Sequence, residues 1–325
     1  MSDKIRVAVA GYGNLGRGAE AAVMRRDDME LAAIVSRRPG IATASPDVPV
    51  VTYDGIASLA GSVDVCLLCG GSANDLWDQG PRVAALFNTV DSFDTHAKIP
   101  EYFEIMDKAA SGGGHVSILS AGWDPGVFSL MRLYCGAFLP EGRSETFWGR
   151  GVSQGHSDAI RRVPGVLRAV QYTVPLDDAV KAARSGGGEL EACQKHRREC
   201  FVVPAPGADT AQIENAIKTM PHYFAGYDVT VTFIGEDEFI ENHRAMPHGG
   251  FVIRNGQTAD GSRSSLEFSL NLGSNPFFTS SVMVSCALAA HRLSRAGRTG
   301  AATLFDIPPA LLSPTPEHKQ RSDIL

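Results

Sequence analysis

The sequence lacks a long hydrophobic run, an excess of basic residues and the leader pattern of an exported chain. Its 325 residues carry a formal net charge of -6, whereas general nucleic-acid binding usually needs a basic face. The most apolar helix-like segment, Phe277 to Ala290, is shorter than the ~18 residues of a membrane span. The N-terminus, "MSDKIRVAVAG", has no signal-peptide layout. We therefore expect a cytoplasmic chain without a nucleic-acid or membrane partner.

The sequence also has too few cysteines for a disulfide framework, with six in a chain of this length. Cys66 and Cys69 form a CxxC pattern, but "VDVCLLCGG" is typical of a buried strand. Residues three apart in a strand lie about 10 Å apart on opposite faces, which is beyond disulfide reach. We therefore predict buried thiols rather than a redox pair.

Glycine, in contrast, is present in a diagnostic arrangement near the start of the chain. Gly11, Gly13 and Gly16 form a complete GxGxxG that follows a predicted strand and precedes a predicted helix. The first glycine permits the tight turn, the second lets the backbone approach a diphosphate, and the third allows close packing of helix on strand. The helix N-terminus offers free N–H groups to the anion. The context predicts a dinucleotide site rather than a plain glycine-rich turn.

The end of the second predicted strand indicates which dinucleotide is bound. A site that prefers NAD places Asp or Glu about 20 residues after the glycines, but this sequence has Ser36, Arg37 and Arg38 there. Guanidinium groups pair bidentately with a phosphate, so we predict NADP. The alternative is that the two arginines are simply solvated.

The first 125 residues alternate strand and helix signals, which predicts a doubly wound, Rossmann-type parallel sheet. The predicted strands and helices are Ile5–Ala10, Leu31–Ser36, Val63–Cys69, Asn88–Asp91 and His115–Ser120, and Leu15–Arg26, Asn74–Phe87 and Pro100–Ala110. After residue 126 a helix over Val127–Phe138 leads into longer strands of alternating polarity, which suit a mixed sheet of an α+β domain.

We therefore expect two domains in an α/β chain. Residues 1–122 bind the dinucleotide, and residues 123–275 bind substrate and form a dimer. The helix that begins at Ser274 or Asn275, together with the tail to residue 325, is expected to return to the first domain. Residues 183–200 are predicted to be a mobile loop that leads into a strand.

Ligands of open parallel sheets bind beyond the carboxyl ends of the strands, and three aspartates lie at such ends here. Asp91, Asp94 and Asp124 would be costly together unless a cation joins them. A substrate ammonium fits this role, whereas no His/Cys spacing supports a metal. Each aspartate alone could equally be a turn former or helix cap.

The second half of the chain supplies positive and polar groups that could clamp carboxylates. For most of them a solvated face or an ion pair within the protein is the competing interpretation. An amine-binding domain and a carboxylate-binding domain together describe a cleft for an amino acid. The candidate residues are His156, Arg161, Arg162, His196, Arg197, Arg198, His248 and Asn275.

Several stretches together resemble the meso-diaminopimelate dehydrogenase family over nearly the whole chain. They are "GYGNLG", "SRR", "VDSFDTH", "AGWDPG", "TFWGRGVSQGHSDAIRRVPGV", "AVQYT", "MPHYFAGY" and "MPHGG". The resemblance implies a homodimer that uses NADP to deaminate the D-centre of meso-2,6-diaminopimelate to L-2-amino-6-oxopimelate, ammonia and NADPH. In reverse this is a step of lysine and cell-wall precursor synthesis. One departure is Phe93, which stands where the family has Tyr.

The resemblance also implies roles for individual residues. Asp94 and Asp124 are expected to hold the reacting amine. Because a carboxylate at this rim can accept the proton of the substrate ammonium, we separately predict that Asp124 is the general base, with Asp94 as its partner. The expected substrate contacts are Asp94, Trp123, Asp124, Phe147, Trp148, Ser153, Gln154, Gly155, Thr173, Arg198, His248 and Asn275. The expected cofactor contacts are Gly11, Tyr12, Gly13, Asn14, Leu15, Ser36, Arg37, Arg38, Cys69, Gly70, Gly71, Ser72, Ala73, Ser92, Phe93, Asp94, Ala121, Gly122, Trp123, Asp124 and Pro125. No metal is expected.

Two alternatives remain open from the sequence. Another two-domain NADP oxidoreductase, such as dihydrodipicolinate reductase or homoserine dehydrogenase, would share the layout but release no ammonia on oxidation. A non-catalytic NADP sensor would bind cofactor without turnover.

Overall fold

The computed structural model describes residues 4–38 and 40–325. The chain divides into two compact units, Met1–Leu130 with Pro276–Leu325, and Met131–Asn275. The boundary between the units falls inside helix α4, Val127–Phe138. No helix within the described ranges is both long and apolar enough to cross a membrane.

The first unit is built on a seven-stranded parallel sheet with the strand order β14-β6-β5-β4-β1-β2-β3. This arrangement confirms the predicted doubly wound fold. The strands are β1 Ile5–Ala10, β2 Met29–Val35, β3 Val50–Val51, β4 Val65–Leu68, β5 Asn88–Asp91, β6 Val116–Ile118 and β14 Gly300–Ala302. The helices are α1 Asn14–Val23, α2 Asp75–Ala84, α3 Ile99–Gly113, α10 Asn275–Arg295 and α11 Glu317–Ile324, with 3-10 turns at Tyr53–Leu59, His96–Lys98, Leu304–Asp306 and Pro309–Leu312.

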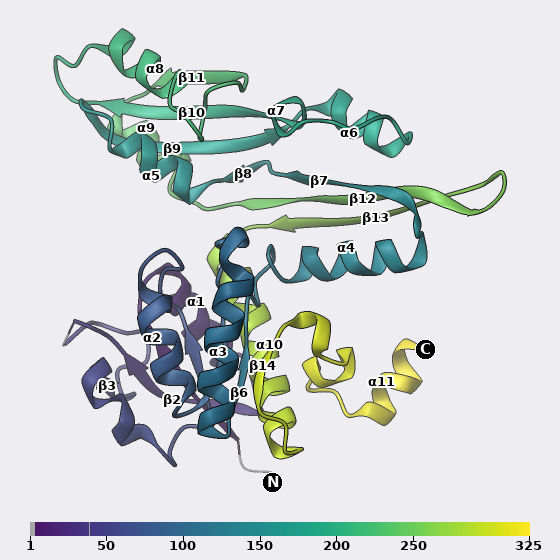
Figure 1. Ribbon diagram of the computed structural model, residues 1–325. Helices are drawn as coiled ribbons and strands as arrows, with labels where there is room; N and C mark the ends of the chain where they lie inside the picture. The colour runs from purple at the N-terminus through teal and green to yellow at the C-terminus, as the bar shows by residue number, and fades with distance from the viewer. Residues whose placement is uncertain (1–3, 39) are drawn as a thin grey trace. The chain divides into compact units, whose positions relative to one another are not determined.

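Both faces of this sheet are covered, because alternate side chains of each strand point to opposite faces. Along β1, Val7 and Val9 join one core cluster, whereas Ala8 and Ala10 join the other. Helices α1 and α10 pack into the first cluster, and α2 and α3 pack into the second (Figure 1). The small alanines on the second face leave room for large side chains of α2 and α3.

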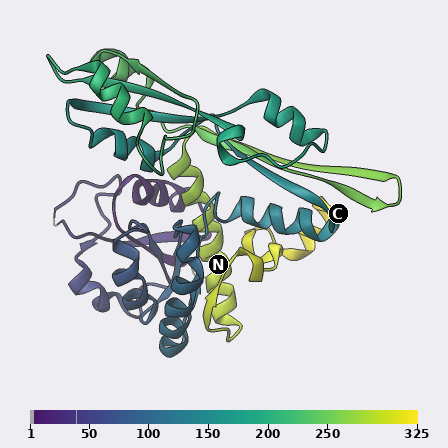
Figure 2. The same ribbon diagram turned by 45° about the horizontal axis from the view of Figure 1, so that its top comes forward.

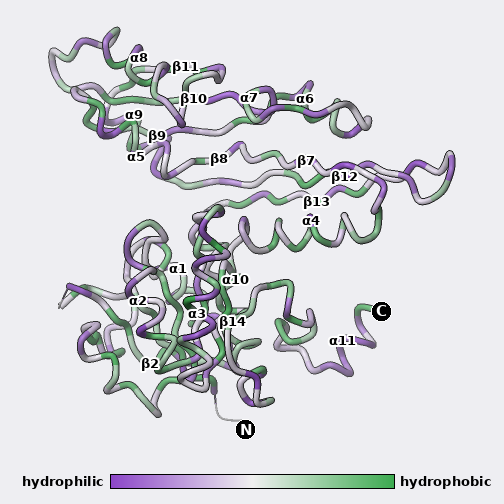
Figure 3. The backbone as a smooth tube through the Cα atoms, in the orientation of Figure 1, coloured by the Kyte–Doolittle hydropathy of each residue, from purple (hydrophilic) through white to green (hydrophobic). Residues whose placement is uncertain are grey.

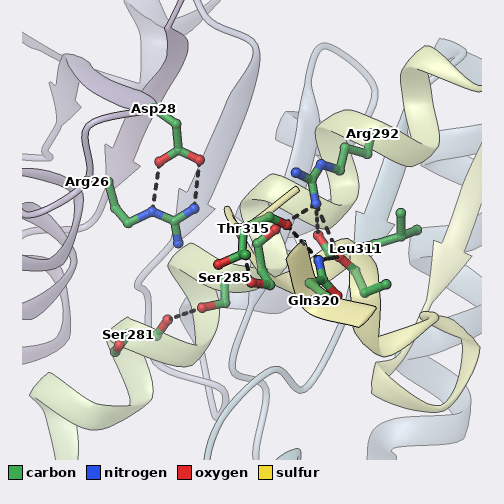
Figure 4. Close-up of polar contacts among 10 residues, drawn as sticks. Arg26, Asp28, Ser281, Ser285, Arg292, Leu311, Thr315 and Gln320 are labelled. Carbon is green, nitrogen blue, oxygen red and sulfur yellow. Dashed lines mark hydrogen bonds and ion pairs between the residues drawn. The ribbon is translucent and has the colours of Figure 1, made fainter. Parts of the chain in front are cut away.

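The C-terminal segment is held to α10 by side-chain bonds to backbone carbonyls. Arg292 Nη1 donates to the carbonyl oxygens of Leu311 at 3.0 Å and Ser313 at 2.9 Å (Figure 4). Gln320 Nε2 donates to Thr315 O at 2.7 Å. Helix α10 starts at Asn275 and stops before Gly297, whose φ of +82° is typical of a helix C-terminus.

The second unit contains two sheets, and its mixed pairing confirms the predicted α+β architecture. In the four-stranded sheet, β11-β10-β9-β8, strand β10 pairs parallel with β11 and antiparallel with β9. The three-stranded sheet is antiparallel, with the order β13-β12-β7. The strands are β7 Glu141–Trp148, β8 Gly151–Val152, β9 Val166–Pro175, β10 His196–Pro204, β11 Val229–Phe233, β12 His248–Ala259 and β13 Ser262–Leu272, and the helices are α5 Gln154–Arg161, α6 Asp177–Arg184, α7 Ala192–Lys195, α8 Thr210–Lys218 and α9 Glu236–Asn242.

Strands β12 and β13 form a long hairpin (Figure 2). Exposure alternates along β13, with Leu266, Phe268 and Leu270 half-buried and the residues between them exposed. The hydropathy of the residues also changes along this strand (Figure 3). It matches the polarity pattern that predicted strands of this kind.

The predicted loop over residues 183–200 was wrong in part. Helix α6 extends to Arg184, a single helical turn spans Ala192–Lys195, and β10 starts at His196. A capping box between Glu191 and Gln194 stabilises this turn. The polar composition of the segment predicted a loop, but hydrogen bonds from side chains stabilise a helical turn there.

Candidate active site

The glycine-rich turn connects β1 to α1, and the three glycines have different steric surroundings. Gly11 has φ +97°, and a Cβ there would lie 3.0 Å from the Cys69 backbone. A Cβ on Gly16 would lie 2.0 Å from Gly11 O. A Cβ on Gly13 would meet nothing within 4 Å, and no side chain caps the α1 N-terminus there. The turn therefore presents open backbone where a diphosphate needs to approach.

Tyr12 lies inside this turn, but its ring faces the protein. Its hydroxyl donates a short hydrogen bond to Glu20, and Arg17 lies over its ring. Glu20 Oε1 also accepts from Ser45 N at 2.8 Å. Tyr12 can therefore offer only its backbone to a cofactor, and its side chain instead anchors the segment that follows the arginine pair.

The arginine pair lies directly after β2 and is largely exposed. Arg37 Nη1 forms an ion pair with Asp75 Oδ1 at 3.0 Å while its side chain is 69% exposed. Asp75 Oδ2 accepts from Gly71 N at 3.1 Å, and Arg38 N donates to Ser36 Oγ at 3.0 Å. The ion pair links the loop after β2 to the start of α2, and guanidinium groups remain at the edge where an adenosine phosphate is expected.

The end of β4 carries the CxxC pattern and the next predicted cofactor segment, Cys69 to Ala73. Cys66 packs in one core cluster and Cys69 against the other, and both thiols are free. Burial raises the pKa of Cys66 to about 12. The prediction of unpaired thiols is thus confirmed, and Cys66 is buried as predicted whereas Cys69 is only half-buried. Ser72 Oγ accepts from Asp94 N at 3.0 Å, so this segment also supports the next loop.

The three predicted rim aspartates differ in exposure. Asp94 is exposed and Asp124 half-buried, and their loops follow the neighbouring strands β5 and β6. Asp91, however, is fully buried, so its expected place at the rim was wrong. It accepts hydrogen bonds from Phe93 N and Ser120 N, which explains why it lies inside the sheet edge.

The remaining residues of these two loops line the same edge mostly through their backbone. Phe93 is fully buried and stacks on Tyr102 with ring centroids 4.1 Å apart. Ala121 and Trp123 are also buried, and Trp123 meets Phe128 edge-on at 5.2 Å. A Cβ on Gly126 would lie 1.9 Å from Gly122 O, so the turn that carries Asp124 and Pro125 is closed tightly.

In the second unit, a buried cation and a hydroxyl lie on neighbouring strands β10 and β9. Arg198 is 8% exposed and has no carboxylate within ion-pair distance among the residues the structure describes. Its Nη1 donates to Thr173 Oγ1 at 2.5 Å, and its guanidinium lies 4.3 Å from the Tyr227 ring centre. Burial lowers the pKa of Arg198, and Nε has no protein partner.

Gln171 completes this arrangement from the same face of β9. Its Nε2 donates to Thr173 Oγ1 at 3.3 Å. Because Thr173 Oγ1 accepts two hydrogen bonds, its own hydrogen is available for an outside acceptor. A buried guanidinium and a hydroxyl donor together suit a ligand carboxylate. Sequence reasoning missed Gln171 and Tyr227, although Gln171 stands two positions before Thr173, where strand alternation places it on the same face.

Arg161, Arg197 and His196 are used within the protein. Arg161 pairs with Asp158, and Arg197 Nη2 pairs with Glu199 Oε1 at 2.9 Å. His196 Nε2 accepts from Trp148 N at 2.9 Å, and burial lowers the pKa of His196 to about 4. His196 is therefore a neutral support for Trp148, which is 36% exposed.

His248 is buried, and its Nδ1 contacts the backbone of the next residue. Gly249 N lies 2.8 Å from Nδ1, and Gly249 O lies 3.2 Å from the same atom. A Cβ on Gly151 would lie 2.4 Å from His248 Cγ, so only glycine fits beside the ring. The position of the ring is therefore fixed by its neighbours.

The other predicted contacts of the second unit differ in accessibility. Gln154 and Gly155 are exposed at the start of α5, after Ser153, whose Oγ contacts His156 Nδ1 at 2.7 Å. Phe147 is fully buried in a core cluster, so only its backbone could contact a ligand. Asn275 N donates to Met246 O at 2.9 Å.

Comparison with known proteins identifies the family of this chain. The family model of the diaminopimelic acid dehydrogenase C-terminal domain matches residues 122–274. A meso-diaminopimelate D-dehydrogenase of Ureibacillus thermosphaericus is 56% identical over 324 residues, which cover 99% of each chain. The chain belongs to the meso-diaminopimelate dehydrogenase family.

Two solved structures of family relatives are similar over the whole chain. The Corynebacterium glutamicum diaminopimelate dehydrogenase in complex with diaminopimelate is 46% identical, with a TM-score of 0.91 and 99% of both chains covered. An engineered D-amino acid dehydrogenase bound to NADP+ is 44% identical, with a TM-score of 0.87 and 99% of this chain and 100% of that chain covered. Dihydrodipicolinate reductase and homoserine dehydrogenase are not favoured, since the full-length curated relatives are meso-diaminopimelate dehydrogenases.

Proposed function

We propose that this chain catalyses the reversible, NADP-dependent oxidative deamination of the D-centre of meso-2,6-diaminopimelate. Water and NADP+ are consumed, and L-2-amino-6-oxopimelate, ammonia, NADPH and a proton are released. The names of the full-length relatives, one complex with diaminopimelate and one with NADP+ support the proposal. In the reverse direction the reaction would supply lysine and cell-wall precursors.

The observation that carries the proposal is the buried Arg198. An isolated buried cation is costly unless a partner neutralises it, and no carboxylate of the described chain does so. A substrate carboxylate supplies that partner, with the Thr173 hydroxyl as a second donor. We assign this pair, together with Gln154, His248 and Asn275, to the non-reacting L-centre of the substrate.

The residues of the first unit fit NADP. The open backbone at Gly13 and the uncapped α1 N-terminus suit the diphosphate. Arg37 and Arg38 are exposed at the end of β2, where a 2′-phosphate would be held. When bound, the nicotinamide supplies the hydride acceptor.

Asp94 and Asp124 would handle the proton chemistry of the amine. The substrate ammonium must lose a proton before it can release hydride, and a nearby carboxylate can accept that proton. The resulting imine carbon is attacked by a water molecule that needs a base again. We assign the base to Asp124 and the positioning of the amine to Asp94, whose N–H is held by Ser72.

We also propose which ligand each domain binds and how two chains assemble. Residues 1–122 would bind the cofactor, with 276–325 packed on that domain, and residues 123–275 would bind substrate and form a cytoplasmic homodimer. Exposed Leu133 and Phe138 on α4 support a subunit interface in the second unit. Light scattering of the purified chain should give twice the mass of one chain, and a monomeric mass would refute the dimer.

One assay tests the function. The chain is mixed with NADP+ or NAD+ and with meso-, LL- or DD-diaminopimelate or a simple D-amino acid, while NADPH absorbance and ammonia are followed together. We expect equal amounts of NADPH and ammonia, fastest with the meso isomer and NADP+. Cofactor binding without turnover would indicate a sensor, and NADPH without ammonia would indicate another oxidoreductase.

A further inference from the structure

The loops that carry Asp94 and Asp124 need contacts that hold them in a fixed position relative to one another. The two loops follow β5 and β6, whose ladder pairs only Thr89 with Ser117 and Val90 with Ile118. The ladder therefore ends before either loop begins.

Asp91 continues the connection where the ladder stops. Its backbone oxygen accepts from Ala121 N at 2.8 Å. Its side-chain Oδ1 accepts from Ser120 N at 3.0 Å and from Phe93 N at 2.9 Å. The backbone of this residue thus bonds to one loop, and its carboxylate bonds to both.

The carboxylate is suited to this task by its two oxygens. Oδ2 accepts from Tyr102 Oη at 3.1 Å, so both oxygens are bonded although the residue is fully buried. Ser120 has φ +54°, which is unfavourable for a non-glycine residue. The charge-assisted bond from its N–H helps to hold that conformation.

In each loop, a buried aromatic residue directly precedes the functional aspartate. Phe93 precedes Asp94 and stacks on Tyr102, and it also meets Trp77 edge-on at 5.4 Å. Trp123, which precedes Asp124, is buried against Phe128. A shift at Asp91 would therefore move two rigid segments rather than one flexible tip.

We propose that Asp91 is a positioning residue for deamination, which sets the placement of Asp94 relative to Asp124 without touching substrate. The inference rests on the proposed function of these two aspartates. It assigns catalytic importance to a buried residue whose bonds are all internal. The carboxylate matters because its charge strengthens both N–H bonds to Oδ1 and because its second oxygen accepts from Tyr102, whereas the NH2 group of an Asn can only donate.

The test compares three variants. Asp91→Asn keeps the size but replaces one oxygen with an NH2 group and removes the charge. Tyr102→Phe removes only the Oδ2 donor and leaves both backbone bonds. Asp64→Asn changes a carboxylate at the opposite end of β4, where it accepts from Arg6 N at 2.8 Å.

For Asp91→Asn we expect kcat to fall about 10- to 100-fold, since misplacement by ~1 Å can cost that much. The pH profile of kcat/KM should shift, while the Kd for NADP+ stays within about threefold, because the glycine turn and the arginine pair are untouched. Amides of Phe93 and Ser120 should lose hydrogen-exchange protection. Tyr102→Phe and Asp64→Asn should lower the melting temperature but keep kcat within about threefold of wild type.

Suppose that the wild type is active and that Asp91→Asn lowers only the melting temperature, with kcat and the pH profile unchanged. That result would overturn this inference and leave the proposed function intact. A Kd for NADP+ that rises as much as kcat falls would also overturn it, because Asp91 would then act through the cofactor site. No ammonia from the wild type would instead overturn the proposed function.

Discussion

Arg198→Met should weaken the binding of substrate without lowering the stability of the fold. The guanidinium is buried beside Thr173 and Tyr227, and one of its nitrogens already bonds to Thr173. Nε has no protein partner and remains for a carboxylate. One hydrogen bond between charged groups is worth roughly 1.5–3 kcal/mol, which corresponds to a loss of about 10- to 10²-fold in kcat/KM.

The same change should leave the fold as stable as before, or more stable. Replacing a buried charge by an apolar side chain of similar length is often neutral or stabilising by about 1–4 kcal/mol, and loss of the contact with the Tyr227 ring offsets part of that gain. The prediction is thus lower activity with an unchanged or higher melting temperature.

The assay measures kcat/KM for meso-diaminopimelate and for a D-amino acid with an unbranched apolar side chain, alongside thermal melting. The loss should fall on the dicarboxylate alone, because the apolar substrate has no distal carboxylate to lose. Arg197→Met is the matched control, since this neighbour on β10 pairs with Glu199. Equal losses on both substrates, or a large drop in melting temperature, would refute the reasoning.

Three further predictions follow from named contacts. Arg37→Glu should invert the NADP/NAD preference in initial-rate assays, because a carboxylate repels a 2′-phosphate and accepts from a ribose hydroxyl; an unchanged preference would show that Arg37 serves only its ion pair with Asp75. Gln171→Leu removes one of the two donors that orient the Thr173 hydroxyl, so KM for meso-diaminopimelate should rise about 3- to 10-fold with the Kd for NADP+ unchanged; an unchanged KM contradicts this. His196 has a pKa of about 4 when folded, below its unfolded value near 6.5, so its contribution of about 3 kcal/mol is present above pH 6.5 and is lost as pH falls to 4. Urea unfolding across that range should show a smaller pH slope for His196→Gln than for wild type, and equal slopes would exclude this role.

Local patterns were sufficient to predict the cofactor half of the fold. The glycine spacing, the β1 and β5 bounds and the α4 bounds follow from neighbours in sequence, and the structure confirms them. Strands β3 and β14 were missed because they have only two and three residues. Such short edge strands form only when a long sheet already offers them a partner.

The candidate site was predicted unevenly for a related reason. Their positions at strand ends placed Asp91, Asp94 and Asp124 together, but only the bonds from Phe93, Ser120 and Tyr102 show that Asp91 is internal. The basic residues of the second half looked alike in sequence. Their partners distinguish them, since Arg197 has Glu199, whereas Arg198 has no carboxylate among the described residues.

The sequence by itself determined the parallel sheet, the dinucleotide turn and the family, because each depends on spacing and residue type over short stretches. Only the tertiary structure decided which charged side chains are available to a ligand. Availability depends on burial and on partners that lie far away along the chain, as Thr173 and Tyr227 do around Arg198. A charged group that forms a hydrogen bond or ion pair within the protein is less available to a ligand. Which charged groups form such internal contacts is known only from the folded structure.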